Sequence, residues 1–114
     1  MSDAQVPAGS GEPVTVRLPA EIDLATAFGA ELDLLAALWS GTAVVIADLT
    51  GTVFCDVAGA RMLASAHREA VTGGAELRIA ASPRARHFLA VTRLAAALPV
   101  YPTLSAALAG RSPA

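Results

Sequence analysis

Four stretches of the chain have the spacing of hydrophobic residues that is typical of β-strands. Residues 43–49 form a continuous apolar run rich in β-branched residues, which predicts a strand buried on both faces. Residues 14–18 alternate apolar and polar side chains between two prolines, which predicts a half-exposed strand at a sheet edge. Residues 75–80 alternate in the same way, and residues 100–101 form a short extended piece. Ile22 belongs either to the first strand or to one that follows it.

Between these strands, apolar residues recur at a spacing of three and four, which predicts four helices. The helices are expected to follow Asp23, Asp56, Ser82 and Thr103. Their expected apolar stripes, in chain order, are Phe28, Leu32, Leu35 and Leu38; Leu63, Ala66 and Ala70; Ala85, Phe88, Leu89 and Thr92; and Leu104, Ala107 and Leu108. Trp39, next to Leu38 at the end of the first helix, is expected to pack there.

Strand and helix patterns alternate along the chain, with about 10 to 15 residues in each helical connection. This alternation is typical of α/β domains with right-handed connections. We therefore expect a single α/β domain, with a mostly parallel mixed sheet of four to five strands and about four helices.

Residues 53–59 mark a switch from strand to helix in the middle of the chain. Asp56 has the residue type preferred at a helix N-cap, where its carboxylate accepts from backbone N–H groups of the first turn. The backbone N–H groups at such a helix start attract anions. This switch is the first candidate for a functional site.

Length and composition agree with one small domain. The chain has 114 residues, which is enough for a single core without a metal or a disulfide. Residues 1–12 are rich in Ala, Gly, Ser and Pro without periodicity and are expected to form a disordered tail. The domain is expected to span residues 13–110, followed by a short tail at 111–114. Hydrophobic residues make up 54% of the chain, but no stretch reaches the roughly 20 apolar residues that cross a bilayer.

Charge and cysteine content argue against several classes of function. The net charge of −2 gives no electrostatic basis for binding nucleic acid. His67 and His87 have no Cys, Asp or Glu partners at metal-ligand spacing, so no metal site or other cofactor is expected. Cys55, the single cysteine, excludes an intrachain disulfide. With no basic and apolar leader in residues 1–12, these features predict a cytoplasmic protein without a membrane partner.

The segment Asp48–Gly59, with the sequence Asp-Leu-Thr-Gly-Thr-Val-Phe-Cys-Asp-Val-Ala-Gly, resembles a motif of STAS domains, the family of bacterial anti-sigma factor antagonists. Residues 21–27, 73–77 and 100–104 match further segments of that family at the expected spacing, so the resemblance covers roughly residues 14–110. The family motif Asp-Ser-Ser-Gly is replaced here by Asp-Val-Ala-Gly. The serine that those antagonists use as a phosphorylation switch therefore falls on Ala58.

The resemblance implies a protein-binding module and not an enzyme. Antagonists of this family dock on an anti-sigma factor with a histidine-kinase-like ATPase fold and displace the sigma factor held there. The anti-sigma factor is often also the kinase that phosphorylates the antagonist. Carried over to this chain, the partner-binding residues are Glu21, Asp23, Asp56, Val57, Ala58, Gly59 and Arg61. Ala58 is then a degenerate phosphorylation site.

Several alternatives to this interpretation remain open from the sequence. Val57 and Ala58 could instead pack the first helical turn onto the sheet, and Asp56 could act only as a cap. The chain could be an antagonist that is never switched off, or a STAS scaffold or subunit of another STAS-containing assembly. Thr50, Thr52 and Ser65 are hydroxyls near the switch that could accept phosphate in place of position 58.

An enzyme is the more distant alternative. Cys55 and Arg61 have the Cys-x5-Arg spacing of protein tyrosine phosphatases, in which a thiolate lies in a phosphate-binding loop. Phe54 stands where those enzymes have a histidine, and the glycine comes one position late. The resemblance to STAS domains instead places Cys55 at the end of a buried strand, as an inert thiol.

Overall fold

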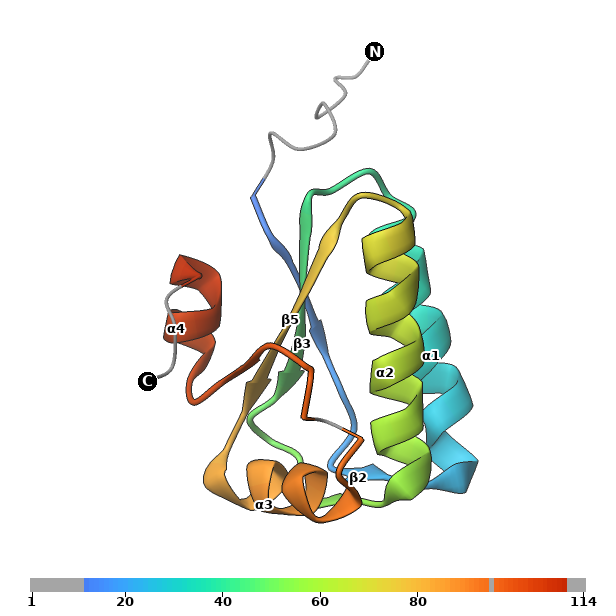
Figure 1. Cartoon of the computed structure of the whole chain (residues 1–114), viewed down its shortest axis with the longest axis vertical. Helices are drawn as coiled ribbons and strands as arrows, with labels where there is room; N and C mark the ends of the chain where they lie inside the picture. Colours follow the sequence, from blue (N-terminus) through green and yellow to red (C-terminus); the bar gives the residue numbers. More distant parts are fainter. Residues whose placement is uncertain (1–11, 95, 111–114) are drawn as a thin grey trace.

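The computed structural model describes residues 12–94 and 96–110 (Figure 1). Its strands are β1 (Val14–Arg17), β2 (Glu21–Ile22), β3 (Val44–Leu49), β4 (Phe54–Cys55), β5 (Glu76–Ala81) and β6 (Val100–Tyr101). Its helices are α1 (Leu24–Leu38), α2 (Val57–Thr72), α3 (Pro83–Thr92) and α4 (Leu104–Ala109). The tails expected at residues 1–12 and 111–114 lie outside the described residues, except for Glu12. The carbonyl oxygen of Glu12 accepts a hydrogen bond from Thr42 Oγ1 at 3.3 Å.

The strands form one sheet in the order β1-β3-β5-β6 and a second, two-stranded sheet of β2 and β4. All pairs in both sheets are parallel. The α/β fold with a mainly parallel sheet and four helices is confirmed. The position of β1 at the edge and the burial of β3 agree with the patterns in the sequence. The second sheet was not predicted, because two-residue strands have no detectable periodicity.

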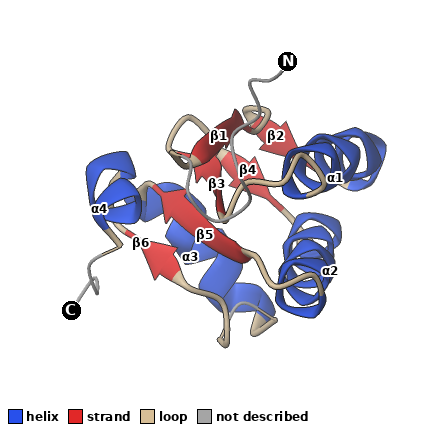
Figure 2. Cartoon of the chain, turned by 90° about the horizontal axis from the view of Figure 1, so that it is seen from above, coloured by secondary structure: helices blue, strands red, loops and turns tan. Residues whose placement is uncertain are grey.

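The main sheet is covered on both faces. Figure 2 shows α1 and α2 side by side on one face and α4 on the other. The larger core lies between the sheet and α1 and α2, where Leu34, Leu63 and Ile79 are fully buried. The smaller cluster under α4 is formed by Ile46, Ala80, Tyr101 and Ala107. Helix α3 lies at the carboxyl ends of the strands, where it contacts β4 and α2 (Figure 1).

The apolar stripe predicted for α1 is wrong at two of its four residues. Phe28 is 69% exposed and Leu32 is 47% exposed, whereas Leu38 is buried and Leu35 packs against the core. The residues that face the core are instead Ala27, Ala30, Leu34, Ala37 and Leu38. Because most of them are alanines, α1 can approach the sheet and α2 closely, and its exposed bulky side chains lie about a third of a turn away.

The packing role predicted for Trp39 is also wrong, since 70% of this residue is exposed to solvent. Together with three residues of the helix it forms what we call the α1 stripe: Leu24, Phe28, Leu32 and Trp39. These four positions fall on one side of α1 at a period of 3.6 residues. The helix therefore has two apolar faces, of which only the alanine-rich one is used in the core. In contrast, the residues predicted to face the core from α2, which are Leu63, Ala66 and Ala70, are all buried.

Candidate functional site

The small sheet of β2 and β4 brings two helix starts together. Glu21 pairs with Phe54 and Ile22 pairs with Cys55, in parallel. The residue after each strand is an aspartate that caps a helix, Asp23 for α1 and Asp56 for α2. The backbone N–H of Asp56 donates to the carbonyl oxygen of Ile22 at 3.0 Å, which ties the two caps to each other.

At the start of α1, Asp23 forms a reciprocal capping box with Thr26. Oδ1 of Asp23 accepts from the backbone N–H groups of Ala25 at 3.0 Å and Thr26 at 3.1 Å. Oγ1 of Thr26 accepts from the backbone N–H of Asp23 at 3.0 Å and donates to the carbonyl oxygen of Glu21 at 2.9 Å. The turn that carries Glu21 is therefore fixed to the helix.

At the start of α2, Asp56 is a simple cap. Its Oδ1 accepts from the backbone N–H of Ala58 at 2.9 Å and from that of Gly59 at 3.4 Å. The cap holds the first turn, in which Ala58 packs partly against the main core. Val57 is 48% exposed and Ala58 is half-buried.

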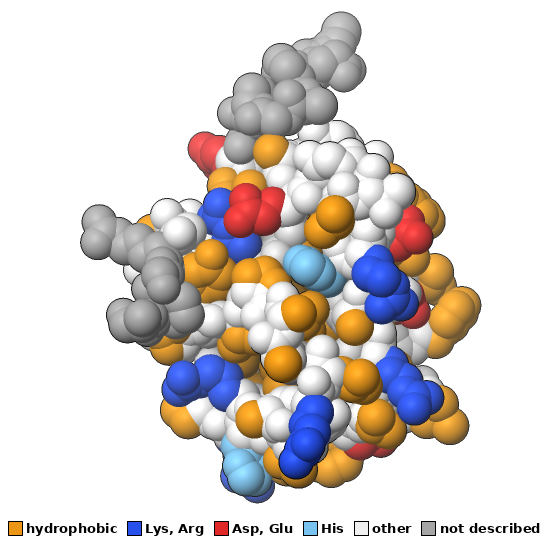
Figure 3. All heavy atoms as spheres, in the orientation of Figure 1, with side chains coloured by type: hydrophobic (Ala, Val, Ile, Leu, Met, Phe, Trp, Pro, Cys, Tyr) orange, Lys and Arg blue, Asp and Glu red, His pale blue; other side chains and the backbone are white. Residues whose placement is uncertain are grey.

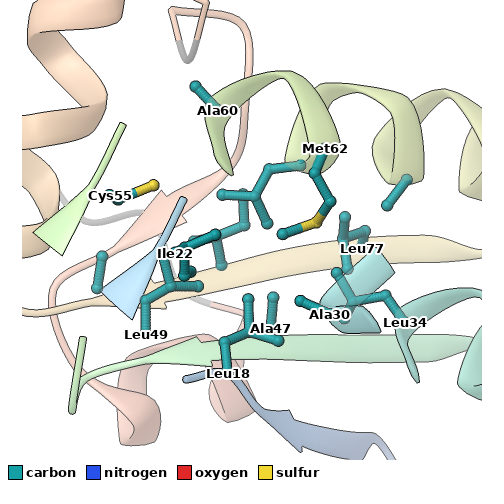
Figure 4. Packing of buried hydrophobic residues seen from close by; sticks show 14 of the residues in the cluster. Leu18, Ile22, Ala30, Leu34, Ala47, Leu49, Cys55, Ala60, Met62 and Leu77 are labelled. Carbon is teal, nitrogen blue, oxygen red and sulfur yellow. The ribbon is translucent and has the colours of Figure 1, made fainter. Parts of the chain in front are cut away.

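Gly59 is the point at which α2 approaches the small sheet most closely. A Cβ at this position would lie 2.5 Å from Sγ of Cys55 and 2.8 Å from Cγ2 of Ile22. Figure 4 shows Ile22 and Cys55 beneath the first turn of α2, near Ala60. Gly59 is buried, so it contributes close packing and not a contact surface. This burial argues against a direct contact between Gly59 and a partner, the role that the resemblance suggested for it.

Cys55 does not have the properties of a nucleophile. The residue is 1% exposed, and burial, followed by the negative charge of Asp56, raises the pKa of its thiol to about 11. A phosphatase cysteine needs the opposite shift, because the thiolate is the reactive form. The geometry therefore supports the buried, inert thiol and not the Cys-x5-Arg enzyme.

The remaining candidates lie around the two helix starts. Glu21 and Arg61 are exposed, whereas Asp23 and Asp56 are half-buried and engaged in their caps. The structure thus brings all the residues suggested by the resemblance into one region, with Gly59 beneath the surface. Their carboxylates and the guanidinium of Arg61 give this region both signs of charge.

The three alternative hydroxyls differ in accessibility. Thr52 is 1% exposed and donates to the carbonyl oxygen of Pro19 at 2.9 Å, so it is closed to a kinase. Thr50 is exposed, but its hydroxyl donates to Oδ1 of the buried Asp48 at 2.6 Å. Ser65 is half-buried on α2.

A groove between α1 and α2 continues from the helix starts, with a volume of about 690 Å³. Leu24, Phe28 and Glu31 of α1 line one side, and Val57, Arg61, Met62, Ser65 and Arg68 of α2 line the other. The roles of Leu24, Phe28, Glu31 and Arg68 as residues that line a groove were not predicted from the sequence. The signal was present: α1 has more large apolar residues than one face can bury.

Metal binding and membrane crossing each place requirements on the described residues. Within residues 12–94 and 96–110, no group of three or more His, Cys, Asp or Glu side chains is placed to bind a metal ion. None of the four helices in the described part of the chain has the length and apolar character needed to cross a membrane.

Known structures of similar shape include two anti-sigma factor antagonists. An anti-sigma factor antagonist from Mycobacterium paratuberculosis has 28% sequence identity and a TM-score of 0.73, over 84% of this chain and 82% of that one. The anti-sigma factor antagonist SpoIIAA in its unphosphorylated form has 18% identity and a TM-score of 0.64, over 83% of this chain and 84% of that one, and shows a likeness of fold alone.

Comparison of sequences gives the family directly. No curated protein matches the chain. The STAS domain family matches residues 4–107, which is most of the 114-residue sequence. With the architecture and the strand-to-helix switch described above, this match shows that the chain belongs to the STAS domain family.

Proposed function

We propose that this STAS domain is an anti-sigma factor antagonist that docks on an anti-sigma factor with a histidine-kinase-like ATPase fold and thereby releases a sigma factor. The docking surface consists of the exposed or half-buried residues at the two helix starts: Glu21, Asp23, Asp56, Val57, Ala58 and Arg61. Such a protein would act in the cytoplasm, where sigma factors work.

The observation that carries this proposal is the pairing of β2 with β4. It supports the proposal because it brings two distant segments, around Asp23 and around Asp56, side by side. Ala58 offers no side chain beyond Cβ, so a partner can approach the first turn of α2 closely. The similarity to an antagonist of 28% identity supports the same assignment.

We further propose that this antagonist is not switched by phosphorylation at the usual position. Alanine at position 58 has no hydroxyl to accept a phosphate, which elsewhere would add a charge of about −1.5 to −2. The burial of Thr52 and the hydrogen bond of Thr50 supply no ready substitute among the loop threonines. Activity would then follow the amount of binding-competent protein. The missing hydroxyl equally supports a non-switching STAS scaffold, or a subunit of a larger STAS-containing assembly. Binding to the anti-sigma factor distinguishes the antagonist from these two alternatives.

The test is a calorimetric titration of the chain against the anti-sigma factor from the same cells, with Ala58→Asp as the probe. We expect the substitution to weaken binding by about 2–5 kcal/mol, or roughly 30-fold to several thousand-fold, because the carboxylate must lose water against the partner. The fold should tolerate it, since a carboxylate in a first helical turn is favoured by about 0.3–1 kcal/mol.

Ser105→Asp is the matched control for the added charge. Ser105 is exposed and is the second residue of α4, as Ala58 is the second residue of α2, but it lies on the opposite face of the main sheet. This control should bind like the unmodified chain. If Ala58→Asp also binds with full affinity and melts normally, the start of α2 is not the interface and the proposal is wrong.

A further inference from the structure

We propose that the α1 stripe and the groove beside it bind a second copy of this chain, giving a two-fold dimer in which the two α1 helices pack antiparallel. Such a dimer covers part of the docking surface at the start of α2. The dimer would regulate the antagonist, and this consequence rests on the proposed function. The formation of the dimer does not depend on the proposed function.

The apolar character of the surface is the first argument. Leu24 is 84% exposed, and the other three residues of the α1 stripe are between 47% and 70% exposed. Single exposed apolar residues are common on proteins, but four large ones along one side of a helix form a contiguous patch. Figure 3 shows hydrophobic side chains along the edge of the molecule formed by α1.

The distribution of charge is the second argument, and it selects the partner. Residues 18–60 contain six acidic residues, Glu21, Asp23, Glu31, Asp33, Asp48 and Asp56, and no Lys, Arg or His. Helix α1 accordingly carries only Glu31 and Asp33 as charged residues. Across the groove, α2 presents Arg61 and Arg68. Among the described residues, Glu31 forms no salt bridge within 4 Å to either arginine.

This groove would best accept a helix that is apolar along one side, has acidic residues beside the apolar ones, and has no basic residues. Helix α1 of the same protein meets all three conditions. The groove and the helix that fits it are thus parts of one surface, which is the requirement for a self-complementary, two-fold interface.

The arrangement of the helices is compatible with this pairing. Helices α1 and α2 run side by side in the same direction, with both starts at the carboxyl ends of the strands (Figure 1). In an antiparallel pair of α1 helices, Glu31, at the middle of α1, lies near the two-fold axis. Arg61 and Arg68 line the groove beside it, so that they can pair with Glu31 of the second copy, and the symmetry makes the contact twice.

The dimer has a direct consequence for docking. Val57 and Arg61 belong both to the groove and to the proposed docking surface. A second copy in the groove would therefore exclude the anti-sigma factor from them. In a chain with no hydroxyl at position 58, self-association would supply a concentration-dependent control of the binding-competent form.

The experiment is sedimentation of the full chain, alone, over a wide range of concentration. We expect a reversible monomer–dimer equilibrium. Phe28→Gln should weaken dimerisation by about 30-fold for each copy of the residue, and up to about 1,000-fold for the two together. The side chain is exposed in the monomer, so the variant should melt normally. Val91→Gln removes another apolar side chain, 64% exposed on α3, and should leave dimerisation unchanged.

Charge reversal tests the pairing across the two-fold axis. Glu31→Arg and Arg61→Glu should each weaken the dimer, and the double variant should recover affinity because the ion pair is rebuilt with its signs exchanged. Failure of the double variant to recover would overturn this pairing.

A monomer at every concentration would overturn the proposal, as would a dimer that Phe28→Gln leaves intact. If the chain is monomeric and Phe28→Gln weakens binding to the anti-sigma factor instead, the groove belongs to that partner and the dimer is wrong. These outcomes are independent of the Ala58→Asp titration, because sedimentation uses the chain without any partner.

Discussion

The starts of α1 and α2 have the same backbone design but are supported differently. Each follows a two-residue strand, is capped by an aspartate, and continues with an exposed apolar residue, Leu24 in one and Val57 in the other. At the third helical position they diverge. Thr26 completes a capping box at the surface, whereas Gly59 lies directly on the buried side chains of Ile22 and Cys55.

This difference shows how one motif can support two helix starts by different contacts. The start of α1 is fixed by local hydrogen bonds among residues 21–26. The start of α2 is fixed by contact with the core, at a distance that only glycine allows. The same substitution should therefore change the stability of the fold in opposite directions in the two helices. The size of each change depends on which atoms lie beneath the substituted residue.

The largest effect is expected from adding one methyl group to a glycine of each helix. Gly59→Ala should destabilise the fold by about 3 kcal/mol, the upper range for overpacking, because its Cβ would meet two fully buried side chains. Gly29→Ala in α1 is the matched variant, since nothing lies within 4 Å of its Cβ. It should stabilise the fold by up to about 1 kcal/mol through helix propensity.

Urea denaturation of the two variants measures both effects. Cys55→Ala combined with Gly59→Ala should recover part of the lost stability, because Sγ is the nearest atom to the added methyl group. Equal effects of the two glycine substitutions would show that α2 does not rest on the small sheet as described.

The next effect is a pH dependence of the stability of the fold, which arises from Cys55 beneath α2. Burial raises the pKa of the thiol from 9.0 to about 11 in the folded state, so folding favours the neutral form. The associated stability is fully present below about pH 9 and is lost as the pH rises toward 11. By linkage, the loss should be on the order of 2 kcal/mol.

Comparison of the chain with Cys55→Ala isolates this contribution, since other groups titrate in both proteins. The difference in unfolding free energy between the two should narrow steadily above pH 9. In the same range, a thiol reagent should react slowly with the native protein and quickly with the unfolded one. A difference that stays constant with pH would mean that the thiol is open to water.

The smallest effects are expected at the caps. Asp23→Ala and Asp56→Ala should each cost about 1 kcal/mol, because two backbone N–H groups lose their acceptor in either case. Asp23→Asn and Asp56→Asn should cost much less, since asparagine caps nearly as well. Thermal melts of the four variants decide this. If asparagine lowers the melting temperature as much as alanine does, the negative charge of the aspartate, and not its capping hydrogen bonds, stabilises the helix start.

The sequence predicted the frame of the fold well where the hydrophobic pattern had one interpretation. Strand β3 is apolar on both faces and helix α2 is apolar on one, so each pattern had one interpretation. Both elements lie where the periodicity predicted them. Helix α1 has two apolar faces, and spacing alone could not show which one meets the sheet. The larger side chains of Phe28 and Leu32 suggested a face that the structure leaves exposed. Close packing against α2 instead favours the alanines of the other face.

The candidate site was predicted in part, for a related reason. Asp56 and its neighbours were visible from the strand-to-helix switch, and Glu21 and Asp23 came from the resemblance to the family. The groove depends on the distance between two helices, and the role of Gly59 depends on the atoms beneath it. Neither is encoded in any local pattern, so both required the structure.

The pairing of β2 with β4 also has a consequence for the order in which the chain folds. The two halves of the docking surface come from segments around Ile22 and Cys55 and are joined by a few backbone hydrogen bonds. Contacts between segments far apart in sequence form only after the intervening chain has closed into a loop. Under the proposed function, competence to bind the anti-sigma factor therefore requires that the segments around Ile22 and Cys55 have paired.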